Sequence, residues 1–234
     1  MSEETSFEAD LPHEVACKEI PEAGVFRIAR RDSPLALSRI SVADAEMPLS
    51  GNRYDVSGGG VLYCATDLEG CYAETLARYR PSPRIIAALG LHTDGYMNVG
   101  SVPADWRLRR VTTRVICQEP LPFVDVEDPR TLATLGELLA KDLVALDMDQ
   151  PLDVSLMRGR NRLVPRLVSR WAYVQQNEDG TPRYSGLRYE SKLGGWECWA
   201  IFDGTRLGQA EERAVSLEDP ELVSVSAMYK LTIH

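Results

Sequence analysis

The sequence has few of the residues that build metal sites, disulfide frameworks or membrane anchors. Its 234 residues include three histidines and five cysteines, with no Cys-x-x-Cys pair and no metal-ligand spacing. We therefore predict no metal centre and no disulfide scaffold. No run of about 20 apolar residues is present, so no membrane-spanning helix is predicted. The acidic start, MSEETSFEADLPHE, lacks an apolar stretch and is not typical of a secretion signal. We expect a cytoplasmic protein with reduced cysteines.

An excess of positive charge is missing as well. The chain has 26 Lys and Arg against 35 Asp and Glu, which gives a formal net charge of −9. Proteins that bind nucleic acid normally carry a basic surface, because neutralising phosphates supplies most of their affinity. The local basic stretch 107–110 is too short to reverse this balance. The charge thus argues against a direct nucleic-acid contact, including an RNA-directed activity.

The bulk composition is that of an ordinary globular protein, with 44% hydrophobic and 26% charged residues. A chain of this length buries roughly 70% of the surface that it exposes when unfolded. The first residues offer few apolar anchors. We predict an acidic, poorly ordered N-terminal extension at 1–22, followed by one domain at 23–234.

Hydrophobic patterning predicts strands and helices in irregular alternation. A helix over 69–79 should end before Pro81 and Pro83. Another should begin at Asp128-Pro129 and carry a leucine stripe as far as Leu146, and a third should cover 163–174. The predicted strands are 25–29, 61–65, 111–117, 187–189, 196–202 and 223–233. This order indicates a compact α+β domain with partly antiparallel sheets and flanking helices.

The segment 51–80, GNRYDVSGGGVLYCATDLEGCYAETLARYR, places three residues that can serve a nucleotide site. Arg53 precedes glycines in a polar loop, and a guanidinium fork suits a diphosphate. Tyr63 offers a flat aromatic face, and Glu74 lies in the following helix. Each residue has an ordinary alternative. Arg53 fits a solvated loop charge, Tyr63 fits a core residue, and Glu74 with Arg78 fits an exposed helix pair.

The pattern G-x-R-aromatic-Asp, then glycines, L-Y-x-A and a helix with A-x-E resembles the RES domain family. That family is named for an arginine, a glutamate and a serine. The resemblance continues in YSGLRYES at 184–191 and WECWAIF at 196–202, and it covers roughly 25–202. It implies an ADP-ribosyltransferase-like fold. The acidic extension and the long stretch 90–110 depart from a minimal member of the family.

The resemblance also implies a set of site residues. The family's arginine, tyrosine, glutamate and serine fall on Arg53, Tyr63, Glu74 and Ser191, and Arg27 fits an arginine early in such domains. Glu74, Arg53 and Ser191 would form the catalytic set. Arg53, Tyr63, Arg27 and Ser191 would bind the substrate, with Ser191 giving a hydroxyl to ribose, amide or phosphate.

The implied activity is cleavage of the nicotinamide–ribose bond of NAD⁺, with water as acceptor in a glycohydrolase or inorganic phosphate in a phosphorylase. NAD⁺ is then a substrate, and no prosthetic group is expected. The alternatives are an ADP-ribosyltransferase that modifies a protein and an inactive nucleotide-binding module. The resemblance further implies the toxin of a toxin–antitoxin pair, restrained by a helix-turn-helix (Xre-type) antitoxin.

Overall fold

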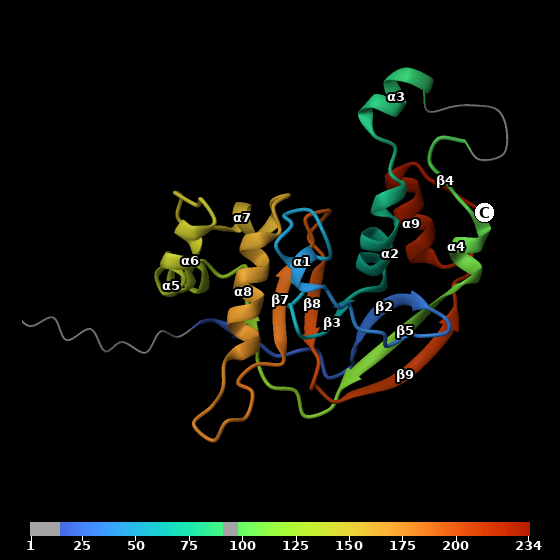
Figure 1. Ribbon diagram of the computed structural model, residues 1–234. Coiled ribbons are helices and arrows are strands. Elements are labelled where there is room, and N and C mark those ends of the chain that lie inside the picture. The colour runs from blue at the N-terminus through green and yellow to red at the C-terminus, as the bar shows by residue number, and fades with distance from the viewer. Residues whose placement is uncertain (1–14, 91–97) are drawn as a thin grey trace, which may run out of the picture.

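A mixed β-sheet forms the centre of the molecule in the computed structural model, which describes residues 15–90 and 98–234 (Figure 1). In chain order its strands are β1 (Cys17–Lys18), β2 (Val25–Arg30), β3 (Val61–Ala65), β5 (Arg110–Cys117), β6 (Phe123–Asp125), β7 (Gly186–Glu190), β8 (Glu197–Phe202) and β9 (Leu207–Ala214). In the sheet they follow the order β1-β6-β7-β8-β3-β2-β5-β9. Neighbouring strands are antiparallel except β6 and β7, which are parallel. A second, two-stranded sheet pairs β4 (Ser101–Val102) with β10 (Thr232–Ile233).

Helices cover the sheet in two groups (Figure 1). One group packs near β6 and β7 and consists of α5 (Pro129–Leu138), α6 (Ala140–Ala145), α7 (Val154–Arg158) and α8 (Leu163–Val174). The other packs on β2 and β3 and contains α2 (Leu68–Leu76) and α9 (Pro220–Tyr229). The remaining helical segments are α1 (Val42–Ala45), the 3-10 turn η1 (Ala77–Tyr79), α3 (Pro83–Leu89) and α4 (Ala104–Leu108).

This architecture confirms the predicted α+β class. The predicted segments at β2, β3, β5, β7, β8 and α8 form within one or two residues of the expected positions, and the predicted helix over 69–79 forms as α2 continued by the 3-10 turn η1. Asp67 is the N-cap residue of α2, and the helix and its 3-10 extension end before Pro81, as expected. All five cysteines are free thiols, as predicted. In the part of the chain that the structure describes, no helix is long and apolar enough to cross a membrane.

The helix that starts at Asp128 shows how a local signal sets a boundary. Its carboxylate accepts hydrogen bonds from the backbone N–H groups of Arg130 and Thr131. The hydrogen bonds from the Arg130 guanidinium, together with these backbone contacts, lower the pKa of Asp128 to about 2. The leucine stripe lies in the core as predicted, but it is shared between two helices, α5 and α6, which meet at Leu139. Its buried members are Leu132, Leu135, Leu139 and Leu143.

The prediction of a strand over 223–233 is wrong. Residues 220–229 form α9, which begins with Pro220 in its first turn, and only Thr232–Ile233 is extended. Leu222, Val225 and Tyr229 are buried at helical spacing against α2. Packing of this face therefore outweighs the β propensity of the valines.

Several further features were not expected from the sequence, among them β4, β6, α4 and α7. β9 was not predicted, because a solvated edge strand has no apolar alternation to reveal it. The seven-residue α3 was not predicted either. Part of the predicted disordered extension is ordered, since β1 pairs with β6 through Cys17 and Lys18. Residues 1–14, and 91–97 of the long stretch 90–110, lie outside the described residues.

Candidate functional site

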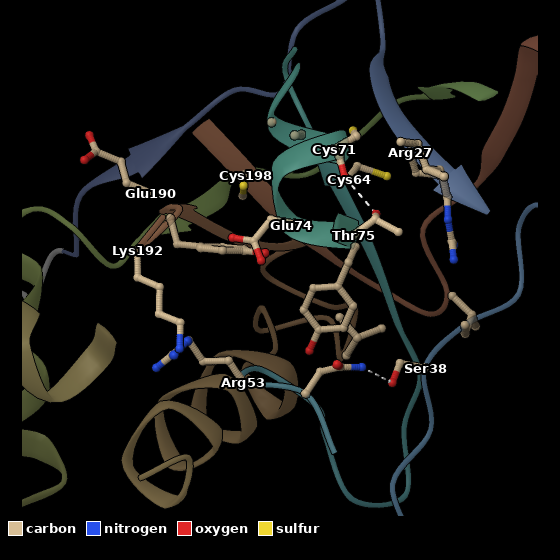
Figure 2. Close-up of a pocket in the computed structure, with 18 of the residues that line it drawn as sticks. Arg27, Ser38, Arg53, Cys64, Cys71, Glu74, Thr75, Glu190, Lys192 and Cys198 are labelled. Carbon is tan, nitrogen blue, oxygen red and sulfur yellow. Dashed lines mark hydrogen bonds between the residues drawn. The ribbon is translucent and has the colours of Figure 1, made fainter. Parts of the chain in front are cut away.

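A cavity of about 480 Å³ lies between α2, β3 and the segments around 53, 160 and 190 (Figure 2). This volume is within the usual range for small-molecule sites. Four of the five predicted site residues, Arg27, Arg53, Tyr63 and Glu74, line it. Its other polar and aromatic lining residues include Asn52, Thr75, Arg158, Arg162, Tyr189, Glu190 and Lys192.

Glu74 projects from α2 into the cavity (Figure 2), and its carboxylate is hydrogen-bonded by Ser191. The Ser191 hydroxyl donates a hydrogen bond to Glu74 Oε1 at 2.6 Å and accepts one from the backbone N–H of Leu193 at 3.1 Å. Ser191 is buried, whereas Glu74 is exposed toward the cavity. A hydroxyl has one proton to donate, and Ser191 donates it to Glu74, so Ser191 orients the carboxylate. Ser191 is not among the residues that line the cavity.

Glu74 differs from the other carboxylate of the cavity in its partners. Glu190 is paired with Arg158 at 2.8 Å and with Arg188 at 3.6 Å. Among the described residues, no ion pair is formed by Glu74, whose recorded partner is a hydroxyl. Its negative charge is therefore available to a ligand in the cavity.

Arg53 connects two loops at the cavity rim. Its Nη1 donates to the carbonyl oxygens of Met157 and Gly159, both at 2.7 Å. Within the described residues its Nε and Nη2 have no hydrogen-bond partner, so two nitrogens of the guanidinium remain for a ligand. The residue thus fixes the end of α7 and keeps donors toward the cavity.

Lys192 is a site residue that the sequence reasoning missed. Its side chain extends toward the same end of the cavity as Arg53 (Figure 2). Burial and the nearby charge of Arg53 lower the pKa of Lys192, while Glu74 acts in the opposite direction. Arg162 also lines this end and donates to the carbonyl oxygens of Leu49, Ser50 and Gly51. The only signal in the sequence for Lys192 was its position directly after the motif serine, Ser191. A single lysine in a loop is common, so this position did not identify it as a site residue.

Two tyrosines give the cavity aromatic walls. The hydroxyl of Tyr63 donates to Asp55 at 3.0 Å and accepts from the backbone N–H of Tyr54 at 3.1 Å. Burial first, and then Asp55, raise the pKa of Tyr63. Because its hydroxyl is occupied, Tyr63 offers a ligand its ring. Tyr189, which packs on Tyr54 with ring centroids 4.6 Å apart, was not singled out from the sequence.

Arg27 and a group of thiols form the other side of the cavity (Figure 2). The Arg27 Nη1 donates to the carbonyl of Ala36 at 3.1 Å, and burial lowers its pKa. Cys64 and Cys71 line this part, whereas Cys198 lies nearer Glu74. Burial raises the pKa of each thiol, to about 12 for Cys64. Such thiols are protonated at neutral pH and are poor nucleophiles.

The family model of the RES domain matches residues 25–222. The chain belongs to the RES domain family. No curated protein matches it. The RES match covers the cavity, including both segments from which the resemblance was drawn. Membership is consistent with an NAD-binding or NAD-acting module related to toxin–antitoxin systems.

Proposed function

We propose that this RES-domain protein cleaves the bond between nicotinamide and ribose in NAD⁺. The observation that carries the proposal is the placement of Glu74, a carboxylate without an ion-pair partner among the described residues, in the cavity that also holds Arg53 and Lys192. A carboxylate near cationic groups fits a substrate that combines an anionic diphosphate with a positively charged pyridinium ring. In one cavity, Glu74 can face the positive pyridinium ring, and Arg53 and Lys192 can face the negative diphosphate.

The chemistry follows from the substrate. When the C1′–N bond breaks, its electron pair goes to the pyridinium nitrogen, so nicotinamide leaves as a neutral molecule without an acid. Positive charge then develops on the ribose, as in glycoside hydrolysis. Glu74 stabilises that charge, and Ser191 holds the carboxylate in place. Arg53 and Lys192 hold the diphosphate, and Tyr63 provides an aromatic face for the nicotinamide.

The acceptor that captures the ribosyl cation defines the enzyme class. Water gives a glycohydrolase and loses its proton to solvent, whereas inorganic phosphate gives a phosphorylase. Transfer to a protein side chain would give an ADP-ribosyltransferase. Incubation with NAD⁺, with and without phosphate, followed by mass spectrometry of the ribosyl product distinguishes the three.

Glu74→Gln is the decisive variant, because it removes the negative charge and keeps the shape. We expect its rate of NAD⁺ loss to fall by about 10²–10³-fold, the usual effect of losing one preorganised electrostatic group. Glu137→Gln is the matched control, since Glu137 is exposed on α5. Wild-type turnover in Glu74→Gln would refute the assignment. A wild-type protein that binds NAD⁺ but releases no nicotinamide would instead be an inactive binding module.

The cellular role proposed from the family is that of a toxin acting in the cytoplasm, with a helix-turn-helix antitoxin covering the cavity. An enzyme that destroys NAD⁺ harms its own cell, so a restraining partner is required. Expression of the chain alone should lower cellular NAD⁺ and stop growth, and Glu74→Gln should do neither. Normal NAD⁺ levels with abundant wild-type protein would contradict this role.

A further inference from the structure

Five arginines gather at the end of the sheet where β2 meets β5, outside the cavity. Arg30 and Arg110 lie directly opposite each other on these antiparallel strands. Beyond them the backbone N–H of Arg31 bonds to the carbonyl of Arg109 at 3.0 Å. Arg78, in η1, is close enough for its charge to act on Arg110. We refer to Arg30, Arg31, Arg78, Arg109 and Arg110 as the arginine patch.

The arginine patch is poorly neutralised by the chain itself. Arg109 is paired with Asp105 at 2.6 Å. In the described part of the chain, the side chains of Arg30, Arg31 and Arg78 form neither an ion pair nor a hydrogen bond. Like charges directly opposite on neighbouring strands destabilise a sheet. A chain with a net charge of −9 nevertheless keeps this arrangement, so the fold itself does not account for it.

Two of these guanidinium groups are supported by aromatic rings. Arg110 lies over Trp106 at 5.1 Å and Arg78 over Tyr79 at 5.1 Å, measured from the guanidinium carbon to the ring centroid. Stacking limits the freedom of the side chains, so less entropy is lost when they bind an anion. Burial lowers the pKa of Arg110; Tyr79 and Asp105 act in the opposite direction, and the charges of Arg78 and Arg30 lower it. A bound anion would relieve this repulsion.

The surroundings of the arginine patch indicate the kind of anion. Leu108, next to Arg109, is 59% exposed. An apolar side chain among arginines fits a polypeptide that carries both carboxylates and apolar groups. A long polyanion such as nucleic acid would extend beyond this compact patch and be repelled by the negative charge of the rest of the protein. None of the five arginines lines the cavity, so the substrate does not account for them.

We propose that the arginine patch, together with Leu108, is a docking surface for an acidic segment of a partner polypeptide. Arginine clusters recognise acidic motifs through paired N–H donors and carboxylate oxygens. The inference is independent of the NAD⁺ chemistry, because it concerns residues that neither line the cavity nor contact Glu74.

Fluorescence anisotropy with a labelled peptide of about twelve residues that alternates Glu and Leu tests the proposal directly. We expect saturable binding at about 50 mM salt that weakens strongly by about 300 mM. Arg30→Gln/Arg78→Gln should weaken binding about tenfold or more. Arg30→Lys/Arg78→Lys should retain most of it, because the charge is kept. Arg170→Gln/Arg206→Gln, two exposed arginines elsewhere, should change the affinity less than about twofold.

Three further measurements separate the arginine patch from a nucleic-acid surface and from the cavity. A Gln-for-Glu peptide should not bind, and a single-stranded DNA of similar length should bind more weakly than the acidic peptide. DNA binding that exceeds peptide binding and is lost in Arg30→Gln/Arg78→Gln would overturn the proposal in favour of a nucleic-acid surface. Peptide binding that is lost in Lys192→Gln but kept in Arg30→Gln/Arg78→Gln would place the peptide at the cavity. Absence of peptide binding at about 50 mM salt would also overturn it.

Discussion

Ser191→Ala tests whether this residue acts through Glu74 or touches the substrate. The bond from the Ser191 hydroxyl to Glu74 Oε1 is 2.6 Å long and is made to a carboxylate. Hydrogen bonds to charged groups contribute about 1.5–3 kcal/mol. If that amount is lost from the transition state, kcat/KM for NAD⁺ should fall about 10- to 150-fold.

A double-mutant cycle separates the two roles. If Ser191 positions Glu74, then Ser191→Ala/Glu74→Gln should be no slower than Glu74→Gln alone, because the group that Ser191 orients is already altered. Losses that add in the double variant would refute the positioning role and favour a direct contact with substrate. The assay is steady-state release of nicotinamide, with urea unfolding to confirm that the variants are folded.

The chain offers a matched control for this cycle. The Ser224 hydroxyl donates to Glu69 Oε1 at 2.6 Å, so the same kind of bond reaches the same helix, α2, outside the cavity. Ser224→Ala should keep the wild-type kcat/KM. A comparable loss in Ser224→Ala would mean that the effect comes from general loosening of α2.

Three other predictions concern stability and are measured by urea unfolding. Tyr63→Phe should lose about 1–3 kcal/mol, because Asp55, which is buried, loses a donor. Gly70→Ala should be destabilised by about 1–3 kcal/mol despite its better helix propensity, since the new Cβ would lie 2.9 Å from Cβ of Trp196. Asp128 has a lowered pKa of about 2, so its contribution is fully present above about pH 4 and is lost as the pH falls toward 2. Asp128→Asn should therefore flatten the stability profile across that range.

Each of these has a clear contrary outcome. If Tyr63→Phe unfolds at the same urea concentration as the wild type, the hydrogen bond from Tyr63 to Asp55 contributes nothing measurable to the free energy of unfolding. A stabilised Gly70→Ala would show that Trp196 can move aside freely. Unchanged acid sensitivity in Asp128→Asn would assign the acid dependence to other carboxylates.

Local signals in the sequence were sufficient for much of the fold, and the motif resemblance identified four of the residues that line the cavity. β3 and α8 form at the predicted residues, β3 as a nearly continuous buried apolar run and α8 with Val164, Val168 and Ala172 on its buried face. α9 was mistaken for a strand, because a valine-rich segment is ambiguous until its packing partner is known. The solvated strand β9 has no apolar pattern, and only its pairing with β5 defines it.

The sequence by itself determined the mixed α+β class and brought Arg27, Arg53, Tyr63 and Glu74 to attention through their motif. Only the tertiary structure decided what each group does there, because hydrogen bonds and charge pairs join residues that are distant in the chain. In the folded chain the Ser191 hydroxyl donates its proton to Glu74, and one nitrogen of Arg53 donates to two backbone carbonyls. The arginine patch likewise exists because strand pairing brings separate segments together, and no local pattern encodes that encounter.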